Sequence, residues 1–316
     1  MSVPRIGITV GDPGGIGPEI ILKSLSSLLD ESDTRFILLG PSSVFSFWTD
    51  RLGIALPSHP NLKIVDIKGD MDRVKIGQDA EENGRISFAA FRESVTLAEK
   101  AELDAVVTAP VSKLSWHRAG INWAGHTEYF QSFYPDAIMT FWAESQRVAL
   151  LSHHVPLRKA LDRVTKEGMV HFIRLLHRAL VAYGMEGYTF LVAGLNPHAG
   201  ESGLLGREEE LEIRPALETV RAEGITVEGP YPPDIVFRMA RGLMDRMVIA
   251  LYHDQGLIAF KLDAFETGVN ATLGLPFVRT SPDHGTAFDI AGKGTADPSS
   301  LISAVRLALR FLTGQA

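Results

Sequence analysis

Three short histidine-bearing turns carry the side chains of this sequence that are best suited to metal chemistry. The turns read SHHVP, NPHAGE and YHDQG, and each follows an apolar run of strand length, which places His154, His198 and His253 just beyond three predicted strands. In α/β proteins, ligand sites form at the carboxyl ends of parallel strands. Neutral imidazole is the commonest protein ligand for metals, and three imidazoles would leave coordination positions open for a substrate.

The same histidines have a plainer interpretation. A single histidine at the end of a strand more often forms a hydrogen bond than binds a metal, and no local motif such as HExxH joins the three turns. Asp254, next to His253, could act as a general base or orient the neighbouring imidazole. It could also simply cap the turn, so the residues alone leave both the metal and the general base open.

A glycine-rich turn near the N-terminus, GDPGGIGPE, follows an apolar strand and opens a helix at Pro18. The glycines either permit a tight, closely packed turn with positive φ, or form an anion-binding loop at a helix N-terminus. The spacing matches neither the dinucleotide-binding fingerprint nor the phosphate-binding loop of nucleoside triphosphatases. Both interpretations therefore stay open.

The elements that must position these residues alternate between strands and helices. Apolar runs predict strands at 6–10, 36–39, 62–65, 105–108, 140–142, 148–152, 190–193, 248–252 and 257–260. Helical spacing is found at 86–100, 166–183, 208–223 and 299–312. This alternation predicts an α/β fold with a largely parallel sheet. The runs at 140–142 and 148–152 suggest an antiparallel pair, and hence a mixed sheet.

The composition narrows the classes of function. The 316 residues include 31 Lys and Arg against 38 Asp and Glu, a formal charge of −7, whereas a general nucleic-acid binder needs a basic face. The absence of cysteine excludes disulfides, iron–sulfur clusters, thiolate metal sites and a catalytic thiol. Neither a signal peptide nor an apolar run of about 18 residues is apparent, so we expect a cytoplasmic protein with no nucleic-acid or membrane partner.

Six longer motifs together suggest a family: GITVGDPGGIGPEI, VTAPVSK, GHTEYF, LNPHAGE, YHDQG and GVNATLGLPFVRTSPDHGT. The chain resembles the 4-hydroxythreonine-4-phosphate dehydrogenase family of pyridoxal phosphate biosynthesis over nearly its whole length. The resemblance implies a two-domain α/β/α architecture similar to isocitrate and isopropylmalate dehydrogenases. It also implies a terminal domain of residues 1–130 plus 262–316, which carries the nucleotide loop. The central domain, residues 131–261, would form the interface of a homodimer, where the active site lies.

The resemblance also implies roles for particular positions. His154, His198 and His253 match the family's metal-binding histidines, and His154 is chosen over His153 because the family histidine precedes an aliphatic residue and a proline. The matched substrate-binding positions are His126, Thr127, Lys261, Asn270 and Arg279, with Lys261 also a catalytic candidate. A loop similar to the nucleotide loop of the related dehydrogenases offers His284, Gly285 and Asp289 to the cofactor. Gly14 is a small departure, since alanine is common there, and we expect alanine to be tolerated.

The implied reaction is an oxidation of a phosphorylated secondary alcohol by NAD or NADP. On 4-hydroxythreonine 4-phosphate, the resulting β-keto acid loses CO₂ to give 3-amino-2-oxopropyl phosphate, with one divalent metal (Zn²⁺, Mg²⁺, Mn²⁺ or Co²⁺) assisting. Relatives that oxidise threonate or erythronate 4-phosphate, or a dihydrodiol carboxylate, share the motifs and remain alternatives. A phosphate acyltransferase and a non-catalytic sugar-phosphate sensor are further alternatives, but neither needs three metal-binding histidines.

Overall fold

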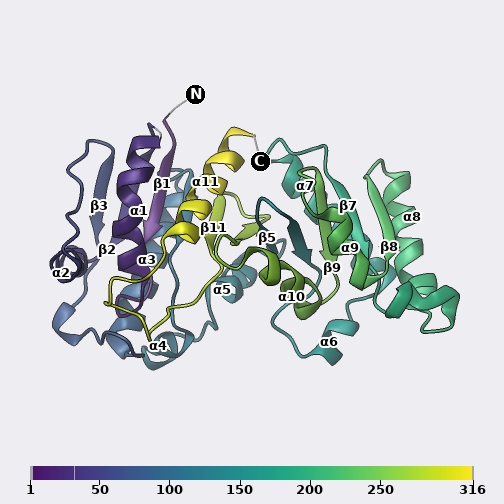
Figure 1. The fold of residues 1–316 in the computed structure, drawn as a ribbon, viewed down its shortest axis with the longest axis horizontal. Helices are drawn as coiled ribbons and strands as arrows, with labels where there is room; N and C mark the ends of the chain where they lie inside the picture. Colours follow the sequence, from purple (N-terminus) through teal and green to yellow (C-terminus); the bar gives the residue numbers. More distant parts are fainter. Residues whose placement is uncertain (1–2, 32, 315–316) are drawn as a thin grey trace. The chain divides into compact units, whose positions relative to one another are not determined.

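The computed structural model describes residues 3–31 and 33–314 and divides the chain into two compact units. Unit 1 consists of the described residues up to Pro135 together with Leu275–Gly314, and unit 2 consists of Asp136–Gly274. Figure 1 shows that each unit is built from strands and helices that alternate along the chain. The stretch 262–274, which the sequence analysis assigns to the terminal domain, lies in unit 2.

Unit 1 is a five-stranded, fully parallel sheet in the order β3-β2-β1-β4-β11. Its helix α3 packs against β1, β2 and β4, whereas α11 packs against β4, β11 and α1. The inner strands β1 and β4 and the strand β11 read as largely buried runs because helices cover the sheet, whereas the edge strand β3 has no fully buried residue. Its elements are β1 (Arg5–Thr9), α1 (Gly17–Glu31), β2 (Arg35–Gly40), α2 (Ser42–Leu52), β3 (Leu62–Asp66), η1 (Met71–Arg73), α3 (Glu81–Glu99), β4 (Ala105–Thr108), α4 (Lys113–Arg118), α5 (His126–Phe133), β11 (Val278–Pro282) and α11 (Ser299–Thr313).

Unit 2 contains a mixed sheet in the order β10-β5-β6-β9-β7-β8. The strand β5 is antiparallel to both β10 and β6, and the remaining pairs are parallel. The α/β class and the mixed sheet are therefore confirmed. Its elements are β5 (Ile138–Trp142), β6 (Arg147–Leu150), α6 (Leu157–Leu161), α7 (Lys166–Val181), β7 (Thr189–Ala193), η2 (Pro197–Gly203), the π-helix η3 (Glu209–Ile213), α8 (Arg214–Ala222), β8 (Val227–Tyr231), α9 (Pro233–Ala240), β9 (Arg246–Ala250), α10 (His253–Ala264) and β10 (Val269–Leu273).

One predicted strand is wrong: residues 257–260 belong to the helix α10. Leu257, Phe260 and Ala264 are buried at helical spacing against β6 and β9. A short apolar run fits a buried helix as well as a buried strand, so the sequence pattern is ambiguous there. The correction places His253 and Asp254 in the first turn of a helix. It also moves the domain boundary, because α10 leads into β10 of the same unit.

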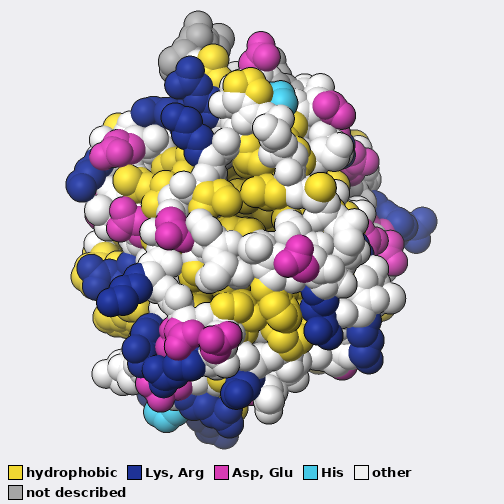
Figure 2. Space-filling view, turned by 90° about the vertical axis from the view of Figure 1, so that its left-hand side faces the viewer, with side chains coloured by type: hydrophobic (Ala, Val, Ile, Leu, Met, Phe, Trp, Pro, Cys, Tyr) yellow, Lys and Arg dark blue, Asp and Glu magenta, His cyan; other side chains and the backbone are white. Residues whose placement is uncertain are grey.

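The surface of unit 1 on the side of α2 and β3 mixes charges of both signs. Figure 2 shows Lys and Arg side chains among Asp and Glu side chains, around apolar patches near the middle of this face. This distribution accords with a chain whose formal charge is only −7. Among the helices in the part of the chain that the structure describes, none combines the length and apolar character needed to cross a bilayer.

The glycine-rich turn is closely packed, which corrects our expectation about Gly14. A Cβ atom at Gly14 would lie far inside van der Waals contact with the Lys75 carbonyl oxygen and the Asn83 amide nitrogen. The Lys75 carbonyl belongs to the backbone and cannot swing aside as a flexible side chain can. Alanine is therefore not accommodated here without a shift of the 75–78 loop.

We expect Gly14→Ala to lower the free energy of unfolding by about 1–3 kcal/mol, the usual cost of overpacking. Chemical denaturation of both proteins measures this difference. Gly187→Ala is the matched control, because no heavy atom lies within 4 Å of a Cβ built at Gly187. If the Gly14→Ala protein is as stable as the wild type, this close approach does not constrain position 14.

Candidate active site

The order of the strands in unit 2 gathers the three histidine turns at one edge of its sheet. The strands β6, β9 and β7 are neighbours and run parallel, so their carboxyl ends lie at the same edge. His154 follows β6, His253 follows β9 and His198 follows β7. Adjacent strands lie about 4.8 Å apart, which brings the start of each turn close to the next.

His154 and His253 lie side by side at this edge. Their ring centroids are 5.7 Å apart, and both line a pocket of about 310 Å³. His153 and Asp254 also line this pocket. His153 is buried, with 9% of its surface exposed, whereas His154 is exposed. Of the two neighbours in SHHVP, His154 is thus the one that presents its ring to solvent.

Asp254 is placed to orient the imidazole of His253. An Asp254 carboxylate oxygen, Oδ1, lies 2.6 Å from Nδ1 of His253, and the Asp254 side chain is 74% exposed. When Nδ1 donates to a carboxylate, the other ring nitrogen is left as a lone-pair donor, which is a common arrangement around metal-binding histidines. The geometry therefore favours an orienting role for Asp254 over a purely structural cap.

His198 does not join the other two histidines in a single chain. Its side chain is 69% exposed, and its Nδ1 lies 3.7 Å from a carboxylate oxygen of Glu201. Across residues 3–31 and 33–314, no group of three His, Cys, Asp or Glu side chains is arranged to hold a metal ion. The imidazoles suit a divalent transition metal in kind, but one chain brings only two of them together.

In unit 1, the predicted substrate residues His126 and Arg279 lie close to each other. An Arg279 nitrogen, Nη2, donates to Oγ1 of Thr108 at 2.7 Å and lies 3.4 Å from Nδ1 of His126. Arg279 stands in β11 with 3% of its surface exposed, and its guanidinium carbon lies 5.7 Å from the centroid of the Phe130 ring. Thr127, the next predicted residue, is also buried.

The electrostatics of this cluster suit an anion. Burial lowers the pKa of Arg279 to about 9, which still leaves the guanidinium charged at neutral pH. Burial, and then the charge of Arg279, lower the pKa of His126 well below its usual range, so its ring is neutral. Nε2 of His126 is shielded from solvent and has no hydrogen-bond partner within the described residues. A planar cation beside a neutral imidazole can bind a phosphate or carboxylate group.

Lys261 and Asn270 stand apart from the histidine pocket of unit 2. Lys261 lies in α10, eight residues beyond His253, which is about 12 Å along a helix axis. Asn270 is buried in β10 and pairs with Phe141 of β5. Neither residue lines the pocket formed around His154 and His253. A common site for all the predicted residues is therefore not assembled within unit 2.

The predicted nucleotide residues His284, Gly285 and Asp289 lie in the loop that follows β11. The glycine-rich turn supports this loop, because the Ile16 amide donates to the Thr286 carbonyl at 3.0 Å. Gly285 and Asp289 are exposed, whereas Nε2 of His284 is shielded. These contacts favour the packing interpretation of the glycine-rich turn, since it braces a loop in its own unit.

Glu19 and Lys23 of α1 hold the far end of the same loop. Lys23 donates to the carbonyl oxygens of Gly294 and Ala296 at 2.8 and 2.7 Å, and to the Glu19 carboxylate at 2.8 Å. The Ala296 amide donates to the same carboxylate oxygen of Glu19 at 2.8 Å. The contact at Ala296 is distant along the chain from Glu19 and Lys23, so no local sequence pattern indicates it.

Asp12 of the glycine-rich turn is a fully buried carboxyl group. Its Oδ1 accepts hydrogen bonds from the Gly14 amide and the Asn83 side chain, each at 2.9 Å. Burial nevertheless dominates and raises the pKa of Asp12 from 3.8 to about 6. Because the folded pKa is the higher one, the stabilising contribution of the neutral form is complete below about pH 4 and is lost as the pH rises through 6.

Asp12→Asn should remove this pH dependence. Relative to the wild type, the free energy of unfolding of Asp12→Asn should rise between pH 4 and pH 7 by up to about 3 kcal/mol, from a shift of about two pKa units. Denaturant unfolding of the two proteins across this range measures the change. Unfolding free energies that stay parallel at every pH would show that Asp12 is not the group responsible.

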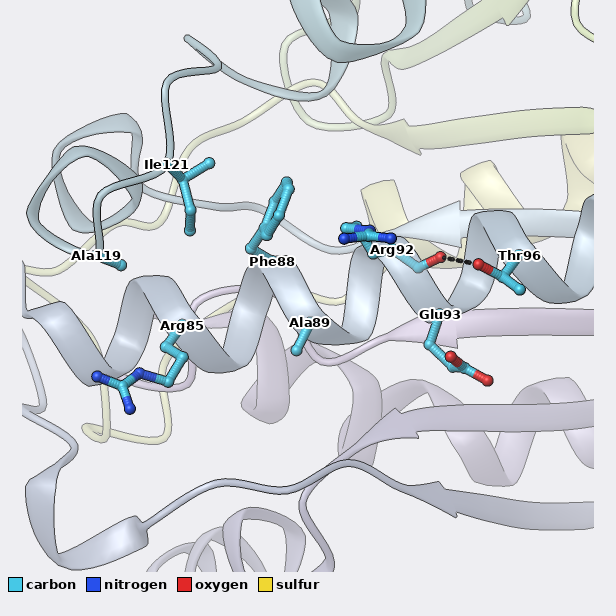
Figure 3. A pocket seen from close by; sticks show the side chains of 8 residues that line it. All are labelled: Arg85, Phe88, Ala89, Arg92, Glu93, Thr96, Ala119 and Ile121. Carbon is cyan, nitrogen blue, oxygen red and sulfur yellow. Dashed lines mark hydrogen bonds between the residues drawn. The ribbon is translucent and has the colours of Figure 1, made fainter. Parts of the chain in front are cut away.

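A second pocket lies on unit 1 and contains none of the predicted residues. Figure 3 shows it along α3, where Phe88 projects from the helix between Arg85 on one side and Arg92 on the other, with Ile121 nearby. Its volume is about 380 Å³. Arg85 pairs with Glu81 at 2.7 Å and with Glu82 at 3.6 Å, so part of the positive charge is already balanced.

Comparison with known proteins supplies the family. Residues 41–308 match the family model described as "Pyridoxal phosphate biosynthetic protein PdxA". A Symbiobacterium thermophilum protein named "Putative D-threonate 4-phosphate dehydrogenase" is 40% identical, over 98% of this chain and 96% of its own length. A Synechocystis protein named 4-hydroxythreonine-4-phosphate dehydrogenase is 38% identical, over 99% of this chain and 97% of its own.

A solved structure agrees with these relatives. The crystal structure of 4-hydroxythreonine-4-phosphate dehydrogenase from Klebsiella pneumoniae matches with a TM-score of 0.86 and 35% identity, over 98% of this chain and 99% of that one. A β-decarboxylating dehydrogenase from Thermococcus kodakarensis shares only the fold, with 16% identity and a TM-score of 0.52. The fold and these relatives define the protein as an oxidoreductase of the dehydrogenase class.

Within that class, the chain belongs to the PdxA family. This confirms the resemblance on which the expected residue roles were based. A dehydrogenase of this family implies a nicotinamide cofactor.

Proposed function

We propose that this protein oxidises 4-hydroxythreonine 4-phosphate with NAD⁺ or NADP⁺ and that the product decarboxylates to 3-amino-2-oxopropyl phosphate, in the pathway to pyridoxal phosphate. Family membership supports the dehydrogenase reaction. The observation that carries the proposal is the gathering of the three histidine turns at one edge of the unit 2 sheet, with His154 and His253 in a common pocket.

A second candidate substrate is D-threonate 4-phosphate. It is favoured by the name of relatives from Symbiobacterium thermophilum and Clostridium botulinum, which are 40% and 39% identical to this chain. The two substrates share the phosphate, the carboxylate and a secondary alcohol. They differ in whether an amino group or a hydroxyl stands next to the carboxylate, so one comparison of rates separates them.

We assign the binding of a divalent cation to His154, His198 and His253. Such a cation, when bound, supplies Lewis-acid stabilisation of the negative charge that develops on the substrate during oxidation and decarboxylation. Asp254 holds the ring of His253 in the tautomer that presents Nε2 as a ligand. The carboxylate of Asp254 is thereby committed to His253, which makes it an orienting residue in this proposal.

The residues of unit 1 bind the anionic groups. Arg279 offers a planar guanidinium to a phosphate or carboxylate, and Thr108 fixes one of its nitrogens. His126 is neutral and can hydrogen-bond the same group without adding charge. In the nucleotide loop, His284, Gly285 and Asp289 are proposed to contact the cofactor.

We further propose that the protein acts as a homodimer. The helix α10 and Phe265, the residue directly after it, expose an apolar stripe: Ile258, Leu262 and Phe265 are 63%, 86% and 69% exposed. Apolar patches of this kind are typical of contact surfaces. Lys261 lies on α10 beside Leu262, so a second copy that covers the stripe would bring Lys261 to the interface.

A second copy also resolves the incomplete histidine set. One described chain pairs His154 with His253 and leaves His198 exposed on its own turn. In a two-fold dimer, His198 of each subunit can complete the His154–His253 pair of the other. The proposal therefore places each active site at the interface, and neither subunit forms it alone.

A substrate panel tests the proposed function. The purified protein, supplied with Zn²⁺, Mn²⁺ or Co²⁺, is mixed with each phosphorylated substrate and with NAD⁺ or NADP⁺, and absorbance at the reduced-nicotinamide band is followed. We expect fastest reduction with 4-hydroxythreonine 4-phosphate, release of CO₂, and loss of the rate on chelation. A faster rate with D-threonate 4-phosphate would favour the second candidate. No turnover with either substrate would overturn both.

A further inference from the structure

A single buried amide side chain connects two of the histidine turns. Gln255 lies in the first turn of α10 and is 9% exposed. Its Oε1 accepts from the Leu251 amide at 2.7 Å, and its Nε2 donates to the Gly194 carbonyl at 2.8 Å. Leu251 leads from β9 into His253, and Gly194 leads from β7 toward His198.

The turn that carries His153 and His154 is hydrogen-bonded to the backbone around the same residue, Leu251. The Ser152 hydroxyl donates to the Leu251 carbonyl at 3.0 Å, and the Leu151 amide donates to the Ala250 carbonyl at 2.9 Å. Ser152 immediately precedes His153 and His154. The peptide groups around Leu251 therefore form the centre of a hydrogen-bonded brace that reaches all three histidine turns, and Gln255 is the member that crosses from β9 to β7.

The turn that carries His198 needs such support because its backbone is strained. His198, Ala199, Glu201 and Ser202 all have positive φ angles, between 44° and 55°. Non-glycine residues in this region cost of the order of 1 kcal/mol each and persist only when their surroundings fix them. Without an anchor, the turn would relax and His198 would change its position.

Glu209 anchors this turn from its other side. Its Oε1 accepts from the amides of Leu195 and Asn196 at 2.8 and 2.7 Å, and its Oε2 accepts from the Asn196 side chain at 2.9 Å. Glu209 is 1% exposed. The Gln255 side chain bonds to the backbone of Gly194, and the Glu209 carboxylate bonds to the backbone of the next two residues. The backbone of every residue from 194 to 196 therefore has a side-chain hydrogen-bond partner.

We infer that Gln255 is a positioning residue for the proposed metal site: it sets where the His198 turn stands relative to the His253 turn. This inference rests on the proposed function, since it assumes that His198 and His253 are both ligands of the proposed divalent cation. The inference is the same whether the His198 that completes a site comes from its own chain or from a second copy, because in either case the turn must be correctly placed in the chain that carries it. Glutamine suits the position because it presents one acceptor and one donor at the same distance from the backbone.

Gln255→Met tests this inference, because methionine fills similar space and makes neither hydrogen bond. Cobalt(II) is titrated into the metal-free full-length protein, and its absorption spectrum and affinity are measured. We expect about 10-fold weaker cobalt binding, at the lower end of the losses seen when groups that support metal ligands are removed, together with an altered spectrum. Circular dichroism checks that the variant is folded.

Gln146→Met is the matched control. Gln146 is also a buried glutamine that bonds to α10, through the Ala259 carbonyl at 3.4 Å and the Asp263 carboxylate at 3.2 Å. These contacts are in the C-terminal half of α10, whereas His253 begins the helix, so the loss of the Gln146 side chain should leave cobalt affinity unchanged. Should Gln255→Met fail to fold, Ser152→Ala removes a milder part of the brace and should weaken cobalt binding about 3-fold, a fraction of the usual range.

The outcomes separate the two proposals. Wild-type protein that binds cobalt, with Gln255→Met or Ser152→Ala binding it equally well and with the same spectrum, overturns the positioning role and leaves the metal site standing. An equal loss of affinity in Gln146→Met also overturns it, because the effect would then follow from general destabilisation. Wild-type protein that binds no cobalt overturns the proposed metal site, and the inference with it.

Discussion

Replacing His198 with alanine should remove the bound divalent cation and with it the dehydrogenase activity, while unit 2 remains folded. The proposed site has three protein ligands, and the loss of one should weaken metal binding by at least about 100-fold, more than is typical for a group that only supports a ligand. The side chain is 69% exposed, so its removal should cost little stability. Metal analysis of the purified variant and its unfolding curve measure both effects.

His171→Ala serves as the control for this substitution. His171 is an exposed histidine of α7 in the same unit, outside the three turns. Its replacement should leave the metal content and the rate unchanged. A His198→Ala protein that retains wild-type metal content and rate would remove His198 from the site.

Arg279→Lys should raise the KM for the phosphorylated substrate by about 10–100-fold, with a smaller effect on kcat. Lysine keeps the positive charge but loses the planar fork, so it cannot both bond to Thr108 and pair with an oxyanion in the same geometry. A hydrogen bond to a charged group is worth about 1.5–3 kcal/mol, which corresponds to this range of KM. Steady-state kinetics with the favoured substrate provides the measurement.

Arg147→Lys separates this effect from the cost of disturbing any buried arginine. Arg147 is 1% exposed in β6, and its guanidinium carbon lies 5.7 Å from the centroid of the Trp142 ring. Its replacement should affect stability and leave the KM unchanged. If Arg279→Lys also leaves the KM unchanged, Arg279 does not bind the substrate.

The sequence was sufficient to predict most of the strands, because the buried strands of this fold are continuous apolar runs. The run at 105–108 is β4 itself, and the antiparallel pair near residues 140–150 appears as β5 and β6. The apolar run at 257–260 was misassigned, because a buried helix segment has the same composition. Gly14 was misjudged for a different reason, since the carbonyl that crowds it belongs to Lys75, far along the chain.

The arrangement of the candidate site could be predicted only in part. The three histidine turns were identifiable from their positions after apolar runs, but the order β6-β9-β7 depends on pairings between strands that are distant in sequence. The closeness of His126 to Arg279 and the bridge made by Gln255 depend on the same tertiary pairings. No periodicity in a single sequence encodes such contacts. The sequence therefore shows Gln255 only as a member of the motif YHDQG and gives no sign of its bond to Gly194.

The most direct test of the proposed interface site is complementation between two inactive variants. His154→Ala and His198→Ala proteins are each inactive in this account, and they are mixed under conditions that exchange subunits. A mixed dimer then contains one site with all three histidines and one site that lacks two. About half of the dimers should be mixed, so roughly a quarter of the wild-type metal content and rate should return. Exchange that is complete by mass analysis yet restores neither metal nor rate would contradict a site shared between subunits.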